Sequence, residues 1–139
     1  MTDNQKSQVL VVEDEAMVSM LIEDMVSDFG GEVVGPAARL DDALTLAREA
    51  KIDVAILDLN LAGVLTYPVA RLLQERGIPF IFATGYGSSG LMADFQSSPT
   101  LQKPFGHNDL EQALSAELSC LDSRKSAEHQ ASSAVKLTA

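Results

Sequence analysis

The sequence has a single cysteine, few basic residues and no long apolar run. One cysteine, Cys120, excludes an intrachain disulfide and suits a reducing compartment. Twenty acidic residues against ten basic ones give a net charge of −10, which argues against non-specific binding to nucleic acid or to an anionic membrane. No apolar run approaches the roughly 20 residues of a membrane helix, and the first residues lack the pattern of a secretory signal. We therefore expect a cytoplasmic protein.

Three runs of apolar or β-favouring residues each end on charge. They are 9–12 before Glu13 and Asp14, 54–57 before Asp58, and 100–102 before Lys103. Short runs of this kind are typical of buried strands in a parallel sheet. Because ligand sites of open α/β sheets lie beyond the carboxyl ends of the strands, we expect these charged residues to share one crevice. Three carboxylates and an ammonium together suit a divalent cation and an anion.

Helical periodicity and turn residues fill the stretches between these runs. The pattern predicts helices at 18–29, at 40–47 and between Thr66 and Gly77, and further strands at 32–34 and 79–83. Gly30-Gly31 is expected to close the first helix, and Gly35-Pro36 to stop the second strand. At 139 residues, this alternation predicts one α/β domain. Its core would be a doubly wound, five-stranded parallel sheet of order 2-1-3-4-5.

The last third of the chain has two weaker signals. Residues 85–95 occupy the place of a helix but contain three glycines, which predicts a short, weak helix. The final helix is predicted to start at Asn108, with Glu111 three residues on as a capping box. From residue 122 the sequence becomes polar and predicts a flexible terminus.

The expected crevice has the residue types for phosphoryl chemistry on a metal. Mg²⁺ prefers oxygen ligands and usually takes one or two carboxylates, so Asp14 and Asp58 suit direct coordination, with Glu13 direct or through water. Asp58 can then act as the nucleophile that forms an aspartyl phosphate. Thr84 offers a hydroxyl, and Lys103 a cation, to the phosphoryl oxygens.

At these positions the chain resembles the receiver domain of two-component response regulators, over about residues 7–120. Glu13-Asp14, Asp58, Thr84 and Lys103-Pro104 stand in the family's order at strand ends. Residues 79–86, Pro-Phe-Ile-Phe-Ala-Thr-Gly-Tyr, resemble the signature of a subfamily named for Phe-Ala-Thr-Gly-aromatic. That subfamily consists largely of alphaproteobacterial single-domain regulators.

The resemblance implies a flavodoxin-like receiver fold over residues 7–121, with flexible termini at 1–6 and 122–139. It further implies Mg²⁺-dependent transfer of phosphate to Asp58 from a histidine kinase or His phosphotransfer protein, with the backbone carbonyl of Asn60 completing the metal shell. Such a protein catalyses only its own phosphorylation and dephosphorylation. It would signal by phosphotransfer or through a downstream protein partner, and no DNA-binding segment follows.

The sequence departs from the family at Ala62-Gly63-Val64, which replaces a Pro-Gly turn, and at Thr100, where receivers usually have a switching Tyr or Phe. We therefore expect residues 85–95 to switch between disorder and order on phosphorylation. Two alternatives are a phosphatase-like enzyme that forms an aspartyl phosphate and a pseudo-receiver that only binds proteins. The first usually needs a second Asp where this chain has Asn60, and the acidic pair, Asp58 and Lys103 argue against the second.

Overall fold

A five-stranded parallel sheet forms the centre of the computed structural model, which describes residues 6–85 and 91–119. Its strands are β1 (Gln8–Val12), β2 (Glu32–Ala37), β3 (Val54–Asp58), β6 (Phe80–Thr84) and β7 (Thr100–Gln102). They lie in the order β2-β1-β3-β6-β7, with all neighbours parallel. Since β6 and β7 are the fourth and fifth strands of this sheet along the chain, the predicted order 2-1-3-4-5 is confirmed.

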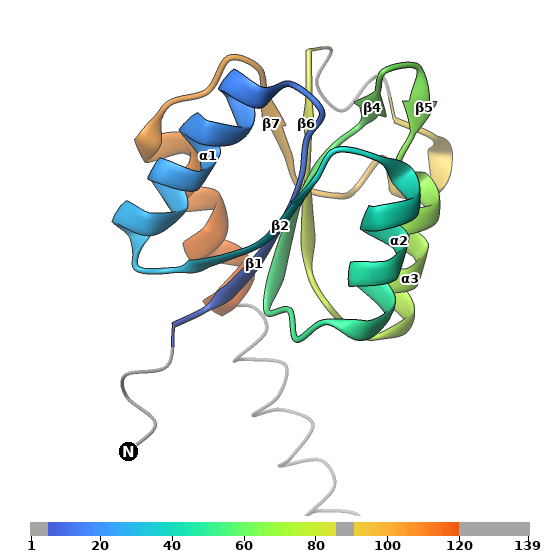
Figure 1. Ribbon diagram of the computed structural model, residues 1–139, viewed down its shortest axis with the longest axis horizontal. Helices are drawn as coiled ribbons and strands as arrows, with labels where there is room; N and C mark the ends of the chain where they lie inside the picture. The colour runs from blue at the N-terminus through green and yellow to red at the C-terminus, as the bar shows by residue number, and fades with distance from the viewer. Residues whose placement is uncertain (1–5, 86–90, 120–139) are drawn as a thin grey trace, which may run out of the picture.

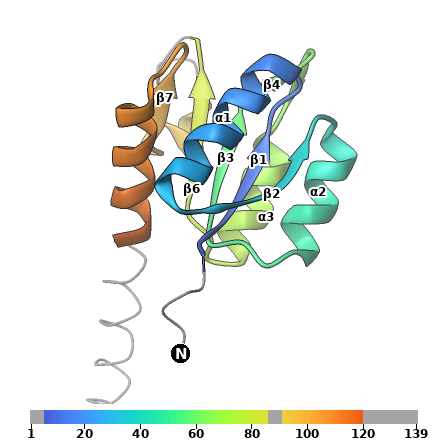
Figure 2. The ribbon, with the colours of Figure 1, turned by 60° about the vertical axis from the view of Figure 1, so that its left-hand side comes forward.

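Helices cover both faces of the sheet (Figure 1 and Figure 2). On one face lie α1 (Ala16–Phe29) and the helix of residues 107–119, drawn in orange. On the other face lie α2 (Leu40–Glu49), α3 (Tyr67–Glu75) and the short 3₁₀ helix η3 (Ala93–Phe95). No helix within the described ranges is long and apolar enough to cross a lipid bilayer.

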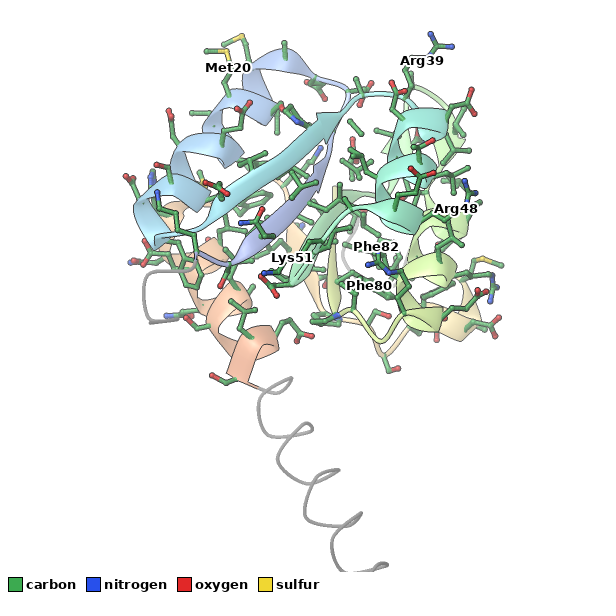
Figure 3. All side chains as sticks on the ribbon, turned by 60° about the horizontal axis from the view of Figure 1, so that its bottom comes forward. Met20, Arg39, Arg48, Lys51, Phe80 and Phe82 are labelled. Atoms are coloured by element: carbon green, nitrogen blue, oxygen red, sulfur yellow. The ribbon has the colours of Figure 1, made fainter. Side chains whose placement is uncertain are left out.

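The two faces have chemically different cores. Beneath α1 and residues 107–119, the buried side chains are aliphatic apart from Met25. The opposite core contains a cluster of four rings, Tyr67, Phe80, Phe82 and Phe95, which we call the aromatic cluster. Figure 3 labels Phe80 and Phe82 on the side of the sheet that α3 covers. Strand β3 lies between the two cores and has all five residues buried, as a central parallel strand requires.

Gly30 closes α1 as the sequence predicts. Its φ of 95° lies in the left-handed region, where a residue without a Cβ has little strain. The Gly30 and Gly31 amides donate to the carbonyls of Ser27 and Val26, at 3.0 and 2.9 Å. By contrast, the expectation that Gly35-Pro36 stops the second strand is wrong, because β2 continues to Ala37. As β2 is an edge strand, a proline there interrupts no pairing on its outer side.

Two short elements differ from the sequence prediction. The sequence predicts a helix at 85–95. Among the described residues of this stretch, only the three residues of η3 are helical, and residues 86–90 lie outside the described ranges. After β3 the chain forms a hairpin of β4 (Asn60–Leu61) and β5 (Val64–Leu65) that no sequence pattern indicated. Its turn has positive φ at Ala62 and Gly63, 49° and 93°. Two successive positive φ values are typical of tight two-residue hairpins.

The start of the final helix also requires a correction. Residues 107–119 are helical, so the helix begins before Asn108, and Glu111 is not the capping residue. Instead, the Gly106 amide donates to Asp109 Oδ2 at 3.1 Å, and Leu110 N donates to Gly106 O at 3.2 Å. A side chain at the third helical position thus satisfies the amide before the helix, which is half of a capping box, two residues earlier than predicted. The predicted flexible termini, apart from Lys6, and Cys120 lie outside the described residues.

Candidate functional site

The predicted site residues meet at the carboxyl ends of the strands. Glu13 and Asp14 follow β1, Asp58 ends β3 and Thr84 ends β6. Lys103 follows β7, and its amide donates to the carbonyl of Thr84 at 2.9 Å. Because β1, β3, β6 and β7 are successive neighbours in the sheet, residues far apart in sequence reach one edge. In Figure 1 this edge is at the top, beside β4 and β5.

Three carboxylates form a compact acidic cluster. One carboxylate oxygen from each of Glu13, Asp14 and Asp58 lies within 4.8 Å of the others. Glu13 is 2% exposed and Asp58 7% exposed, while Asp14 is half-buried. Glu13 Oε2 also accepts a hydrogen bond from Glu15 N at 3.2 Å. Like charges at this spacing repel in a partly dehydrated site, so the cluster favours a cation or a proton.

Lys103 is the cation within this cluster. Its Nζ lies 2.9 Å from Glu13 Oε1 and 3.4 Å from Asp58 Oδ2. Burial on its own would lower the pKa of the ammonium, but the hydrogen bond to Glu13 and the charges of Asp58 and Glu13 outweigh it and raise that pKa. Lys103 therefore stays charged and partly neutralises both carboxylates.

Asp58 has the perturbed acidity of a reactive group. Burial, and after it the negative charge of Glu13, raise the pKa of Asp58 to about 7 against the opposing effects of the Lys103 charge and the Asn60 amide. In the metal-free protein, Asp58 therefore holds a proton well above the pH at which an exposed aspartate loses it. Strongly shifted carboxylates in a cleft are candidate functional groups.

The backbone after Asp58 is tightly held. Asn60 N donates to Asp58 Oδ1 at 3.3 Å, and Leu59 N donates to the carbonyl of Ala83 at 3.0 Å. The Asn60 side-chain oxygen accepts from Gly63 N at 2.6 Å, which ties it to the hairpin turn. The hydroxyl of Thr66 donates to the Asp58 carbonyl at 2.8 Å. Sequence reasoning used Thr66 only as a helix start, since no motif shows that its side chain turns back to the strand.

Gly85 follows Thr84 in open space: a Cβ built there would meet nothing within 4 Å. This leaves room beside Thr84. Tyr86, the last residue of the 79–86 motif, lies outside the described residues. His107 pairs with the carboxylate of Asp28 at 3.1 Å, both side chains largely exposed, and so stands apart from the acidic cluster. His129 is also outside the described ranges.

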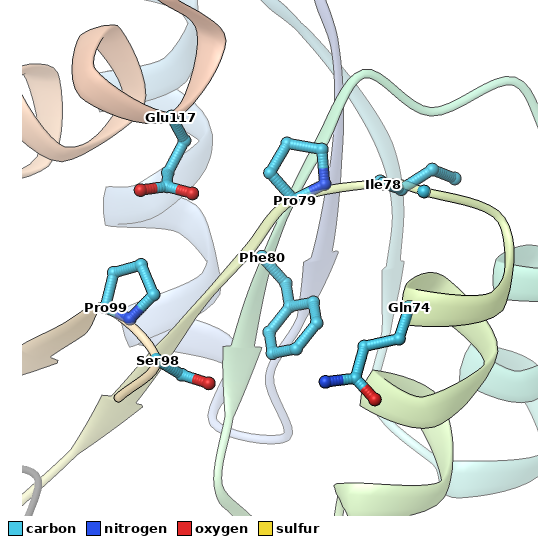
Figure 4. Close-up of a pocket in the computed structure, with 8 residues that line it drawn as sticks. Gln74, Ile78, Pro79, Phe80, Ser98, Pro99 and Glu117 are labelled. Atoms are coloured by element: carbon cyan, nitrogen blue, oxygen red, sulfur yellow. The ribbon is translucent and has the colours of Figure 1, made fainter. Parts of the chain in front are cut away.

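Two pockets differ in how near they lie to this site. One of about 220 Å³ lies at the amino ends of β6 and β7, remote from the acidic cluster (Figure 4). Pro79, Phe80 and Pro99 line it together with Gln74 and Glu117. A second pocket, of about 320 Å³, lies beside Lys103 and is lined by apolar residues of α1 with Pro104 and Phe105. Only the second adjoins the charged edge.

Known proteins share this architecture. A family model described as the response regulator receiver domain matches residues 9–115. SdrG from Sphingomonas melonis Fr1, a solution structure, is 39% identical with a TM-score of 0.73, covering 81% of this chain and 97% of SdrG. The response regulator PhyR from Brucella abortus is 28% identical with a TM-score of 0.80, covering 93% of this chain and 56% of PhyR.

A curated relative, the probable transcriptional regulator ycf27 from Porphyra purpurea, is 29% identical over 122 residues. The aligned region is 84% of this chain and 49% of that relative, so the chain spans about half the length of the relative. The family match covers most of the described sheet and every charged residue at its carboxyl edge. The chain therefore belongs to the response regulator receiver domains of two-component systems.

Proposed function

We propose that residues 7–121 form a phosphoacceptor receiver in which Asp58 takes a phosphoryl group from a histidine kinase or a His phosphotransfer protein. The observation that carries this proposal is the placement of Asp58, a buried carboxylate with a pKa of about 7 that lies among two further carboxylates and one ammonium. Such a protein is a signalling module and acts on no substrate beyond its own phosphoryl group.

The acidic cluster fits a magnesium ion. Three carboxylates with oxygens within 4.8 Å of one another form a donor set of the hard, oxygen-only kind that Mg²⁺ prefers. Glu13, Asp14 and Asp58 would hold the ion with the carbonyl of Asn60. When bound, Mg²⁺ would neutralise the carboxylates and the charge of an incoming phosphoryl group. Asp58 would then lose its proton below the pH at which it does so alone.

The remaining residues have roles in the transfer itself. An oxygen of Asp58 forms the bond to phosphorus while the phosphorus–nitrogen bond of a phosphohistidine breaks, and the bonding electron pair leaves with the imidazole nitrogen. Lys103, 3.4 Å from Asp58 Oδ2, can stabilise negative charge on the phosphoryl oxygens. Thr84, at the end of β6, would donate its hydroxyl to another of these oxygens.

An apolar surface beside the site supports a protein partner. Met17, Met20 and Leu21 of α1 are exposed by 79%, 64% and 55%. Figure 3 shows Met20 at the outer side of α1. Leu21 also lines the apolar pocket that includes Lys103. Exposed apolar residues beside a reactive group are typical of a docking surface for another protein, here the phosphodonor.

Residues 79–86 support assignment to the Phe-Ala-Thr-Gly-aromatic subfamily, and we propose that a downstream protein reads the phosphorylated state of this chain. The acidic character of the chain, with a net charge of −10, disfavours direct output through nucleic acid or a membrane surface. A phosphatase-like activity is disfavoured because the Asn60 carboxamide is too weak an acid to act as a general acid, and its side-chain oxygen accepts a hydrogen bond from Gly63 N.

Phosphorylation of purified protein tests the proposal. Incubation with a phosphorylated histidine kinase or a small phosphodonor plus Mg²⁺ should add one phosphate that is stable in acid and labile in base. Asp58→Ala and Asp58→Asn should take no label. Asp14→Asn should stay folded but bind Mg²⁺ more weakly. Label that persists in both Asp58 variants would remove the assignment.

A further inference from the structure

Thr66 is a fully buried hydroxyl beside the reactive strand. It precedes α3, at the position where a threonine side chain commonly caps the amides of the first helical turn. Here the side chain makes no such cap. Its Oγ1 turns back and donates to the carbonyl of Asp58 at 2.8 Å, with the carbonyl of Leu59 at 3.3 Å. The hydroxyl thus binds backbone carbonyls at the end of β3 and not the first amides of α3.

These bonds fix the backbone that presents Asp58. The carbonyl of Leu59 also accepts Thr66 N at 3.0 Å, so Thr66 binds this turn through both its amide and its side chain. Asn60, the next residue, donates its amide to Asp58 Oδ1. Any shift of the 58–60 backbone would therefore move the Asp58 carboxylate relative to Glu13 and Lys103.

Tyr67, the next residue, binds a different part of the molecule. Its hydroxyl accepts a hydrogen bond from Met92 N at 2.8 Å. Its ring stacks on Phe95 with centroids 5.1 Å apart and packs edge-on against Phe82 at 5.8 Å. Leu91 and Phe95 are buried, so the segment 91–95 is anchored largely through the aromatic cluster.

Two adjacent residues thus connect the reactive backbone to the segment after β6. Thr100, on β7, has no ring that could rotate in response to a change at Thr84. We propose that Thr66 is a positioning residue for phosphorylation of Asp58, and that Tyr67 carries a change at the Asp58 backbone to residues 91–95. This inference rests on the proposed phosphoacceptor function and names the residues through which that site acts.

Labelling rates from phosphoramidate at saturating Mg²⁺ test the positioning role. Thr66→Val keeps the shape and removes the hydroxyl, and we expect labelling to slow by about tenfold, since small displacements of a reacting group are costly. Thr66→Ser keeps the hydroxyl and should label within about twofold of the parent. Thr45→Val is the matched control, because Thr45 Oγ1 donates to the Asp41 carbonyl at 3.1 Å on exposed α2; it should label as the parent does.

Equal rates for Thr66→Val and the parent would overturn the positioning role, as would equal slowing by Val and Ser. A parent that takes no label at Asp58 would overturn the proposed function itself, so the two failures are distinguishable. Melting temperatures of all variants identify slowing that merely follows from loss of stability.

Amide exchange of Met92 tests the second part of the proposal, the connection through Tyr67 to residues 91–95. In the parent, its protection should change when beryllofluoride and Mg²⁺ are added. Tyr67→Phe keeps the ring on Phe95 and removes the acceptor for Met92 N, and we expect that change to be lost while the labelling rate stays within about twofold. A Tyr67→Phe variant with the parent's full response at residues 91–95 would exclude Tyr67 as the connection.

Discussion

The two ends of the sheet differ in what they bury. In the described part of the chain, the buried polar or charged residues are Glu13, Ser19, Asp58, Thr66 and Thr84. All but Ser19 lie at the carboxyl ends of the strands, around Asp58. The amino ends of β6 and β7 instead border a small pocket that is lined by Phe80, Pro79 and Pro99 together with polar side chains. The carboxyl end is thus organised for chemistry at a cost in stability, whereas the amino end contributes packing.

The largest expected effect is at the amino end. Phe80 begins β6, is buried, and packs edge-on against Phe82 and Phe95 with centroids 5.4 and 6.1 Å apart. Phe80→Ala should lower the free energy of unfolding by about 3 kcal/mol, because it removes a buried ring and leaves a cavity. The folded protein should still label at Asp58 at close to the parent's rate. Urea denaturation measures the first quantity. A loss of labelling out of proportion to unfolding would show that the two ends are not separable.

Asp58→Asn should have the opposite effects to Phe80→Ala: the variant should take no label and should be more stable than the parent. An aspartate has an ordinary pKa of 3.8, and in the folded protein that of Asp58 is about 7. The folded state therefore binds the proton more tightly than the unfolded state, and Asp58 makes the metal-free parent less stable as the pH rises from about 4 to about 7. Without Mg²⁺, Asp58→Asn should be more stable than the parent by roughly 1–3 kcal/mol at pH 8. The difference should shrink towards pH 4; a constant difference would mean that Asp58 does not titrate in this range.

Magnesium should stabilise the carboxyl end by a smaller amount. At ten times its dissociation constant, Mg²⁺ should raise the free energy of unfolding by about 1.4 kcal/mol. Binding should weaken below about pH 7, because the ion must displace the proton of Asp58. Thermal melts with Mg²⁺, and with Ca²⁺ for comparison, measure this at several pH values. Asp14→Asn should lose most of the effect, and an unchanged response there would place the ion elsewhere.

The smallest effect is expected away from both ends. His107 pairs with Asp28 at 3.1 Å, and their side chains are exposed by 53% and 63%. Exposed pairs contribute little, so His107→Ala should change the free energy of unfolding by less than about 0.5 kcal/mol. Labelling should be unaffected. A clear change in labelling would extend the functional region along the start of the final helix.

The order of the strands and the meeting of Glu13, Asp14, Asp58 and Lys103 could be predicted from the sequence, because both depend on a simple rule. Buried parallel strands are continuous apolar runs, and their carboxyl ends share an edge, so a charged residue after each run is placed by its strand. No comparable rule covers Thr66. Its function depends on which way one hydroxyl turns, and a threonine before a helix usually caps it.

The other differences also have local physical causes. Gly35-Pro36 is a turn signal, but on an edge strand tertiary pairing with β1 overrides it. The hairpin after Asp58 needed a positive φ at Ala62, which alanine rarely adopts and no pattern indicates. The final helix begins at the earlier register because Asp109 is placed to bind the Gly106 amide.

The ion pair between Lys103 and Glu13 has a consequence for folding as well as for chemistry. Its partners are 90 residues apart in the chain, and they come from the first and last strands of the sheet in sequence order. Contacts of such high sequence separation form late, because closing a long loop is entropically costly. A chain still in synthesis, with β7 not yet made, would have the acidic cluster without its cation. Under the proposed function, competence to accept phosphate would arise only once β7 has joined the sheet, so the label would report complete folding as well as signalling.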